Sequence, residues 1–385
     1  MILPGSPIGV LGGGQLGMFF TVAAQKMGYR VVVWDPHPEA PARFVADSFM
    51  GAAFNDPKAI LSFMNEVHAV TYEWENVPAD TVSEIEKKVI TRPGSLVLRL
   101  LQNRATQKNF LHDHGFPIAP FYCFDNPQIL SLHTSSLGLP CIIKTSSSGY
   151  DGQGQWHITK SDQISCLIEQ LKKQSCPSGW VLEKKIDFQK EISVIVVRGD
   201  SGEILTYPIA ENIHEQGILR ISCVPAKINE EEERQATSLA AEAVGALQQS
   251  GVFCVEMFLT QNGKLLINEI APRPHNSGHY SMDVCSVSQF EQQVRVLCGL
   301  PLIAPELFSP AVLVNILGSE IEKLTAEKEI LSVKGIRFYD YRKSISKPGR
   351  KMGHLLIVNK DAEKAMEQAQ YILSLLRDAT QNLPL

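Results

Sequence analysis

The segment that most constrains the fold of this chain is residues 254–279, which reads CVEMFLTQNGKLLINEIAPRPHNSGH. Two apolar stretches with the composition of β-strands flank Asn262-Gly263, a dipeptide typical of a two-residue turn between antiparallel strands. Such a turn places Glu256 directly opposite Glu269, with both side chains on one face of the hairpin. The sequence therefore predicts a hairpin that brings two carboxylates together.

Two facing glutamates destabilise a hairpin through charge repulsion unless a cation lies between them. Mg²⁺ prefers hard oxygen ligands, so Glu256 and Glu269 are candidate magnesium ligands. Two other interpretations of the same residues stay open. The glutamates could lie on a solvated face, or the loop could be longer than two residues and the pairing different.

A second segment, residues 140–155 (PCIIKTSSSGYDGQGQ), predicts a phosphate-binding loop. The apolar stretch Cys141–Thr145 reads as a strand that carries Lys144 near its end, and a Ser/Gly loop follows. Glycines let backbone N–H groups approach an anion closely, and the lysine supplies a positive charge. No Lys-Ser/Thr pair follows, so this is not a P-loop. A flexible hairpin loop is the alternative, but together with the glutamate pair these features describe a nucleotide–Mg²⁺ site.

Composition excludes several classes of protein. The 385 residues are enough for two or three domains, and the net charge of −5 gives no reason to expect nucleic acid or a membrane surface as a partner. The eight cysteines show no Cys-x-x-Cys spacing, which indicates core thiols in a reduced compartment. No apolar run long enough for a membrane span and no signal-peptide pattern occurs. We therefore expect a cytoplasmic protein.

The N-terminal residues predict a βαβ unit of the α/β class. Ile8–Leu11 and Val31–Trp34 read as strands, with an amphipathic helix over Leu16–Met27 between them. The turn at Gly12–Gly17 matches the dinucleotide fingerprint Gly-x-Gly-x-x-Gly, and Asp35 ends the second strand. An NAD-dependent dehydrogenase is therefore an alternative, although any doubly wound domain needs a tight turn at this place.

The rest of the chain alternates strands and helices, and its character changes after Pro301. The expected strands are residues 69–72, 141–145, 180–184, 191–197, 312–317, 335–341 and 354–358, and the expected helices are 103–111, 162–174, 230–249 and 362–377. Acidic residues follow the strand at 69–72, where open α/β sheets place their ligands.

The order of these motifs resembles the ATP-grasp ligases, and within them the N5-carboxyaminoimidazole ribonucleotide synthetases. The motifs that carry the resemblance are GGGQLG (12–17), TYEWENVP (71–78), NRATQK (103–108), SSGYDGQGQ (147–155), NEIAPRPHNSGH (268–279) and PGRKMGH (348–354). It implies an ATP-grasp fold, α/β overall and α+β in its middle domain. A doubly wound pre-ATP-grasp domain is expected at 1–103, the ATP-grasp domain at 104–300 and a small C-terminal domain at 301–385. Family members are usually homodimers.

The resemblance also implies a reaction, the ATP-dependent carboxylation of 5-aminoimidazole ribonucleotide (AIR) in de novo purine biosynthesis. Bicarbonate attacks the γ-phosphate of ATP to give carboxyphosphate, which carboxylates the exocyclic amine of AIR and leaves ADP and phosphate. The substrates are then ATP, bicarbonate and AIR, with Mg²⁺ as the metal. The protein contributes positioning and charge stabilisation.

Individual residues take roles by matching the family motifs. The ATP-binding residues so implied are Arg104, Lys144, Gly149, Tyr150, Asp151, Gly152, Gln153, Gly154, Gln155, Glu183, Lys184, Lys185, Ile186, Glu191, His214, Asn268 and Glu269. The implied metal ligands are Glu256 and Glu269. The residues implied to contact AIR are Tyr150, Asp151, Arg273, His275, Arg350 and Lys351. The implied catalytic residues are Asp151, Arg273 and His275, and Asp151 is the expected proton acceptor from the amine.

Two positions depart from the family pattern. Gln153 stands where relatives usually carry Arg or Lys, and Met18 stands where many carry Arg, so an AIR contact could be weaker. Three other functions are compatible with parts of the sequence. A dehydrogenase leaves the glycine loop and the glutamate pair without a role, and a non-catalytic nucleotide-binding regulator does not need Arg273 and His275. A formate- or glycine-using ribonucleotide synthetase of the same superfamily is the closest rival.

Overall fold

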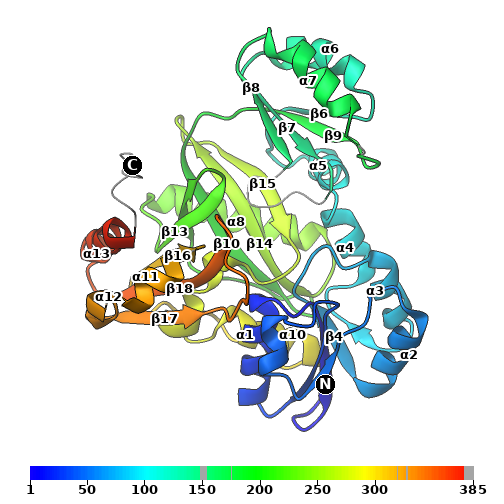
Figure 1. Cartoon of the computed structure of the whole chain (residues 1–385), viewed down its shortest axis with the longest axis vertical. Coiled ribbons are helices and arrows are strands. Elements are labelled where there is room, and N and C mark those ends of the chain that lie inside the picture. The colour runs from blue at the N-terminus through cyan, green and yellow to red at the C-terminus, as the bar shows by residue number, and fades with distance from the viewer. Residues whose placement is uncertain (148–153, 175, 319, 327, 377–385) are drawn as a thin grey trace.

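The computed structural model describes residues 1–147, 154–174, 176–318, 320–326 and 328–376. Their strands form three sheets, which follow one another along the long axis of the molecule (Figure 1). In this described part of the chain, no helix has both the length and the apolar character needed to cross a membrane. The predicted site residues Gly149 to Gln153 lie outside the described residues.

The N-terminal sheet is parallel and has the strand order β3-β2-β1-β4-β5, as expected for a doubly wound domain. Its strands are β1 (Pro7–Leu11), β2 (Arg30–Trp34), β3 (Ser48–Met50), β4 (Ala69–Tyr72) and β5 (Ile90–Thr91). Its helices are α1 (Gln15–Lys26), η1 (Pro41–Phe44), α2 (Pro57–Glu66), α3 (Ala79–Glu86) and α4 (Ser95–Leu101). The strand order reverses between β1 and β4, so the carboxyl ends of these two strands flank the crevice where such sheets bind ligands.

A four-stranded antiparallel sheet with the order β6-β9-β7-β8 lies at the opposite end of the molecule, at the top of Figure 1. Its strands are β6 (Phe121–Phe124), β7 (Cys141–Thr145), β8 (Gln155–Ile158) and β9 (Trp180–Lys184). Its helices are α5 (Arg104–Asp113), η2 (Pro127–Ile129), α6 (Leu130–Leu137) and α7 (Gln163–Lys172). Alternate residues of β7, Cys141 and Ile143, pack against α6 and α7, which leaves the other face of the sheet for Lys144.

The central sheet is antiparallel and joins the last third of the chain to the middle. Its order is β15-β14-β10-β12-β13-β16-β18-β17, with β11 beside β10. The strands are β10 (Phe188–Arg198), β11 (Ile204–Thr206), β12 (Ala210–Glu215), β13 (Ile218–Val224), β14 (Gly251–Thr260), β15 (Leu265–Ala271), β16 (Ala311–Leu317), β17 (Ile336–Asp340) and β18 (Lys351–Val358). Because β13 pairs with β16, the C-terminal strands extend this sheet rather than form one of their own.

Helices cover both faces of the central sheet. They are α8 (Glu230–Ala246), η3 (Asn276–Gly278), α9 (Ser281–Val284), α10 (Gln289–Cys298), α11 (Glu320–Ala326), α12 (Lys328–Ser332) and α13 (Ala362–Leu376). The small residues Ala236, Ala240 and Ala243 recur at helical spacing, so α8 lies close against β10 and β14. On the other face, α10 buries Phe290, Val294 and Leu297 against α1 and so joins the N-terminal sheet to the centre. The molecule is thus built around one sheet that reaches all its parts.

The β14–β15 hairpin pairs Glu256 with Glu269, as the sequence predicted, but the predicted turn is wrong. The amide N–H of Thr260 donates to the Lys264 carbonyl, so the loop has three residues and Gly263 adopts φ +77°. A three-residue loop alone would move the register by one residue and place Asn268 opposite Glu256. A β-bulge at Asn268 restores the register.

The bulge also changes the direction of Asn268, which would face away from Glu269 in a regular strand. Both residues are half-buried, and they lie between the buried Ile267 and Ile270. The alternation of the strand is therefore interrupted at this pair, so Asn268 shares the accessible side of β15 with Glu269.

Candidate active site

The base of the glycine loop is held by the first turn of α5. The backbone N–H of Arg104 donates to the Ser146 carbonyl at 2.7 Å, and its guanidinium donates to the Thr145 carbonyl at 3.0 Å. Asn103 caps the helix by accepting from two backbone amides. Gly154 closes the loop at φ +71°, and a Cβ there would lie 2.7 Å from the Thr145 hydroxyl. Helix and loop base therefore form one unit, with Arg104 at the base of the predicted phosphate loop.

Lys144, Lys108 and Glu183 form a buried charge cluster on the open face of the four-stranded sheet. The Glu183 carboxylate lies 3.1 Å from the Lys144 ammonium and 3.5 Å from that of Lys108. Burial favours the neutral acid, but the two lysines overcome it and hold the pKa of Glu183 at about 2. The pKa of Lys108 is lowered, because burial disfavours its charged form. The attraction of Glu183, which Lys108 shares with Lys144, does not offset this effect. The cluster places two lysines and one carboxylate at the base of the glycine loop.

The hinge segment Glu183 to Ile186, whose residues match the family's ATP-binding residues, connects the four-stranded sheet to β10. Lys184 directs its ammonium to the carbonyls of Gly138 and Leu139, at 3.1 and 2.9 Å, and the Lys185 amide donates to Pro140. Glu183 is 3% exposed, and its carboxylate is taken up by the lysines. The side chains of Glu183 and Lys184 are therefore engaged within the protein, which leaves backbone groups to read a base.

Two strands of the central sheet hold a second charged pair. Glu191 on β10 and His214 on β12 form an ion pair between a carboxylate oxygen and Nδ1. Burial acts against the charged imidazole, but the hydrogen bond and charge of Glu191 prevail and raise the pKa of His214. The charges of both residues act on Glu256, so the structure brings the three together.

The paired carboxylates on β14 and β15 have the chemistry of a magnesium site. Burial, followed by the charge of Glu269, raises the pKa of Glu256 to about 7. This cost of ionisation is what a divalent cation between the carboxylates would remove. The donor atoms of Cys254, Glu256 and His275 also lie within 4.8 Å of one another. The oxygens suit Mg²⁺ better than a thiol whose pKa burial raises far above its usual value.

Arg273 and His275 follow β15 and lie at the same end of the sheet. The Arg273 guanidinium lies 3.1 Å from the Glu75 carboxylate, which comes from the segment after β4. His275 Nε2 lies 3.3 Å from a carboxylate oxygen of Glu256. Burial, and then the charge of Arg273, lower the pKa of His275 well below its ordinary value. A fixed cation and a neutral imidazole therefore stand beside the carboxylate pair, where the N-terminal sheet meets the central one.

The glycine turn of the N-terminal domain faces this same junction. The Gly13 N–H donates to the Asp35 carboxylate at 2.6 Å, and the Gly14 N–H donates to Glu73 at 2.7 Å. A dinucleotide-binding turn offers these amides to a pyrophosphate, but here the protein's own carboxylates occupy them. This geometry argues against the dehydrogenase alternative.

The consecutive basic residues Arg350 and Lys351 have different surroundings. Arg350 donates to the Ile345 carbonyl at 2.7 Å on an exposed loop. Lys351 begins β18, and its charge acts on Glu256 and His275. Of the predicted pair, the structure brings Lys351 to the carboxylate site and keeps Arg350 at its margin.

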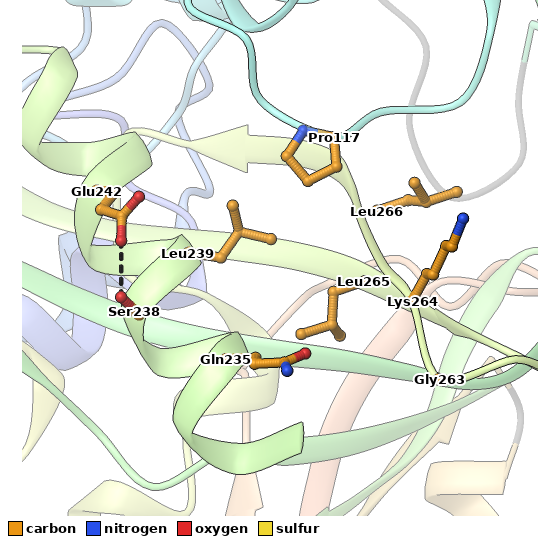
Figure 2. Close-up of a pocket in the computed structure, with 9 residues that line it drawn as sticks. All are labelled: Pro117, Gln235, Ser238, Leu239, Glu242, Gly263, Lys264, Leu265 and Leu266. Carbon is orange, nitrogen blue, oxygen red and sulfur yellow. Dashed lines mark hydrogen bonds between the residues drawn. The ribbon is translucent and has the colours of Figure 1, made fainter. Parts of the chain in front are cut away.

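A cavity of about 620 Å³ lies elsewhere, between α8 and the β14–β15 loop (Figure 2). Leu239, Leu265 and Pro117 line it, and Ser238 donates to Glu242 at its rim. This is the face of the sheet that α8 covers, whereas Glu256 alternates to the other face. The cavity is therefore separate from the charged residues described above.

Comparison with known proteins places this arrangement in a family. Three family models match in succession: the ribonucleotide synthetase preATP-grasp domain at residues 6–102, the ATP-grasp domain at 109–290, and the phosphoribosylaminoimidazole carboxylase C-terminal domain at 311–368. The chain is 40% identical to the N5-carboxyaminoimidazole ribonucleotide synthase of Bacillus subtilis, over 96% of this chain and 95% of that protein. It belongs to the N5-carboxyaminoimidazole ribonucleotide synthase family.

Solved structures of this synthase family agree with the fold. A synthetase solved as its ADP complex superposes with a TM-score of 0.92 at 40% identity and covers 97% of each chain. The Aspergillus clavatus synthase, solved with ADP and 5-aminoimidazole ribonucleotide, superposes with a TM-score of 0.88 at 30% identity over 96% of this chain and 98% of that one. The chain is therefore an ATP-grasp ligase with the three-domain plan predicted from its motifs.

Several residues of this synthase site were not singled out from the sequence. Lys108 follows Arg104 by one helical turn, a spacing that places both on one side of α5 and could have revealed it. Gln107 binds both the N–H and the carbonyl of Ile270, at 2.8 and 3.1 Å, and so ties α5 to the strand that carries Glu269. No local sequence pattern predicts that contact, because the two residues are 163 positions apart.

Proposed function

We propose that this chain is a synthase that uses ATP and bicarbonate to carboxylate AIR, giving N5-carboxyaminoimidazole ribonucleotide, ADP and phosphate. The observation that carries the proposal is the junction of Glu256 and Glu269 with Arg273 and His275 on one edge of the central sheet. It provides carboxylates for a metal, a cation for an acyl phosphate and a neutral imidazole within one site. The domain boundaries proposed are 1–103, 104–300 and 301–385.

ATP is proposed to lie between the four-stranded and central sheets. Arg104 and Lys144 would contact the phosphates, because both lie at the base of the glycine loop. Gly154 and Gln155 form the end of that loop. The hinge at Lys185 and Ile186 would read the base through its backbone, and Glu191 with His214 would meet the ribose or phosphates. Gly149, Tyr150, Asp151, Gly152 and Gln153 complete the proposed loop by resemblance alone.

Glu256 and Glu269 would hold Mg²⁺, and Asn268 would contact ATP beside them. The oxygen donor set and the raised pKa of Glu256 support this fit. When bound, the metal would neutralise charge on the transferred phosphoryl group.

Arg273 is proposed to bind the carboxyl and phosphate oxygens of carboxyphosphate, because a guanidinium binds such groups in a bidentate manner. Glu75 fixes its position at 3.1 Å. Lys351, with Arg350 at the margin, would bind AIR together with His275 and Tyr150. Asp151 remains our candidate acceptor for the amine proton. We also propose a cytoplasmic homodimer, as is usual in the family.

The test is phosphate release from ATP with AIR and bicarbonate each added or omitted. We expect release that requires Mg²⁺, rises with AIR and consumes bicarbonate. Release that needs formate or glycine with a different ribonucleotide would instead assign the chain to a sister ligase. Tight NADH binding without ATP cleavage would overturn the proposal.

A further inference from the structure

The imidazole of His275 is held from behind by Ser277, the second residue of η3. The backbone N–H of Ser277 donates to Nδ1 of His275 at 3.3 Å, and the Ser277 hydroxyl lies 2.9 Å from the same nitrogen. A backbone N–H can only donate, so Nδ1 must accept. In a neutral imidazole, the single ring hydrogen is then on Nε2, the nitrogen that lies 3.3 Å from Glu256.

A chain of buried side chains supports this arrangement. The Ser277 hydroxyl lies 2.7 Å from that of Ser193, Asn212 donates its amide to Ser193 at 2.9 Å, and Ser222 donates to the Asn212 carbonyl oxygen at 2.7 Å. Each of the four residues is at most 5% exposed.

The directions of these hydrogen bonds are linked. Because Ser193 accepts from Asn212, its own hydrogen can go to Ser277, and the Ser277 hydrogen can then go to His275. Reversing the Asn212 amide would reverse every bond and require Nδ1 to donate, against the direction set by the Ser277 amide. The donor direction therefore runs from Ser222 toward the imidazole.

The central sheet fixes the geometry of this relay. Ser193 lies directly opposite Glu256 across β10 and β14, and Asn212 lies opposite Ser222 across β12 and β13. The relay therefore runs across adjacent strands beneath the proposed metal site. Gly278 lets η3 pack onto this face, since a Cβ there would lie 2.8 Å from Ile195.

The backbone of His275 is fixed as well. Gln289 of α10 accepts from the His275 N–H at 2.9 Å and donates to its carbonyl at 2.8 Å. With both the backbone and Nδ1 held, the ring cannot turn without breaking several buried hydrogen bonds.

We propose that Ser277, with Ser193, Asn212 and Ser222 behind it, is a positioning residue that keeps His275 in the Nε2–H tautomer. His275 then meets the reactants as a neutral hydrogen-bond donor. It would donate to an oxygen of the carboxyphosphate or of the transferred carboxyl group, and it would neither remove the amine proton nor ligate the metal through Nε2. This role rests on the proposed function, but the tautomer itself does not.

The tautomer can be measured directly by ¹⁵N NMR on the full-length protein labelled at histidine. The signals of His275 are assigned from their loss in His275→Asn. We expect a one-bond coupling to hydrogen at Nε2 and a bare Nδ1. Hydrogen on Nδ1, or on both nitrogens, would overturn the proposal whether or not the protein carboxylates AIR.

Variants test the relay. Ser277→Ala should lower kcat with AIR about tenfold or more, because losing a hydrogen-bond partner that orients a working side chain has a cost of this size, and it should leave the KM for ATP unchanged. Asn212→Asp keeps the shape but accepts from both neighbours, so it should move part of the His275 population to the Nδ1–H tautomer. A merely structural role for these residues would leave the NMR signature unchanged in any variant that folds.

Thr134→Val is the matched control. It removes a buried hydroxyl that bonds within α6, far from the relay, and should leave both kcat and the His275 signals as in the parent protein. If Ser277→Ala, which loses the hydroxyl but keeps the backbone N–H, retains the parent kcat, the relay has no positioning role. Absence of AIR-dependent ATP cleavage in the parent protein, with the tautomer as expected, would overturn only the proposed function.

Discussion

At the scale of single residues, the site is built from charges that are costly to bury. Glu256 and Glu269 oppose each other on paired strands, and burial and repulsion raise the pKa of Glu256 to about 7. Above that pH, the apo protein keeps the Glu256 charge beside Glu269, with His214 and Lys351 as the positive groups that act on it. The site is therefore less stable empty than a neutral pair would be, and a bound cation relieves the cost.

Replacing either glutamate should separate activity from stability. We expect Glu256→Gln and Glu269→Gln each to lower kcat by about 100-fold or more, because stabilisation of the transferred phosphoryl group is lost. The free energy of unfolding of the apo protein at pH 8 should not fall, since repulsion is removed. Denaturant titration and steady-state kinetics check the two effects. The exposed Glu242→Gln, on the opposite face, is the control and should change neither.

In the Lys108–Glu183–Lys144 cluster, unlike at the glutamate pair, removing a carboxylate should lower the stability of the protein. Glu183→Gln leaves two lysines, one of them 3% exposed, without a counter-charge, and we expect a loss of about 3–5 kcal/mol in the free energy of unfolding. In the parent protein, Glu183 has a depressed pKa, so its contribution is complete above about pH 4.5 and is lost as pH falls toward 2. Urea titrations across that range measure both effects, and an unchanged midpoint for the variant would contradict the role assigned to the cluster.

At the scale of elements, the β14–β15 hairpin shows how a correct pairing can follow from an incorrect turn. Asn-Gly favours a two-residue turn, but the Thr260 hydroxyl accepts from the Lys264 N–H at 3.0 Å and donates to Asn262 at 2.6 Å, which stabilises a longer loop. The bulge at Asn268 then recovers the register. The pattern of apolar residues predicts neither the three-residue loop nor the bulge. Most other strands match their apolar runs closely, because burial on one or both faces specifies them directly.

The loop predicts a contrast between two glycines. Gly263→Ala meets no neighbour within 4 Å, so its cost is conformational: φ +77° disfavours alanine, and we expect a loss of about 1 kcal/mol. Gly245→Ala lies inside α8 with its Cβ at ordinary contact distance, and it should gain about 1 kcal/mol. Thermal or urea unfolding of both variants checks the contrast. Equal effects of the same sign would contradict the three-residue loop.

At the scale of the whole molecule, an aromatic cluster joins the parts of the chain. Phe19 of α1 lies with its ring centroid 5.3 Å from His279 and 6.2 Å from His354, and Tyr341 donates to or accepts from His354 at 2.9 Å. Burial lowers the pKa of His354 to about 3. The N-terminal domain, the residues after β15 and the C-terminal strands thus share a core that is stable only with neutral imidazoles.

This core makes stability depend on pH. The unfolded chain protonates His354 below about pH 6.5, but the folded chain does not do so until about pH 3. The free energy of unfolding should therefore decrease as pH falls from 6.5 toward 3. His354→Gln should flatten that dependence, measured by urea titration at several pH values. His112→Gln removes a histidine from an exposed position and is the control. An equally steep dependence in His354→Gln would contradict the role of this residue.

The sequence predicted the three-domain plan better than it predicted the contacts among the domains. The hairpin pattern and the family motifs single out Glu256, Arg273 and His275 as candidates, because reaction chemistry limits the residue types that can serve. The partners that hold them come from distant parts of the chain: Glu75 follows β4 within the family motif at 71–78, whereas Ser193 carries no pattern of its own. Their positions follow from sheet order, which local periodicity does not specify.

The pairing of β13 with β16 determines what happens when the chain is shortened. The last third of the chain is not a detachable module, because its removal at residue 300 would leave the backbone of β13 unpaired along a newly opened sheet edge. Such an edge is a template for pairing with another chain, so a truncated protein is a candidate for aggregation during expression. Trimming this protein for crystallisation or fusion should therefore be planned around the sheet and not around the family boundaries at residues 290 and 311.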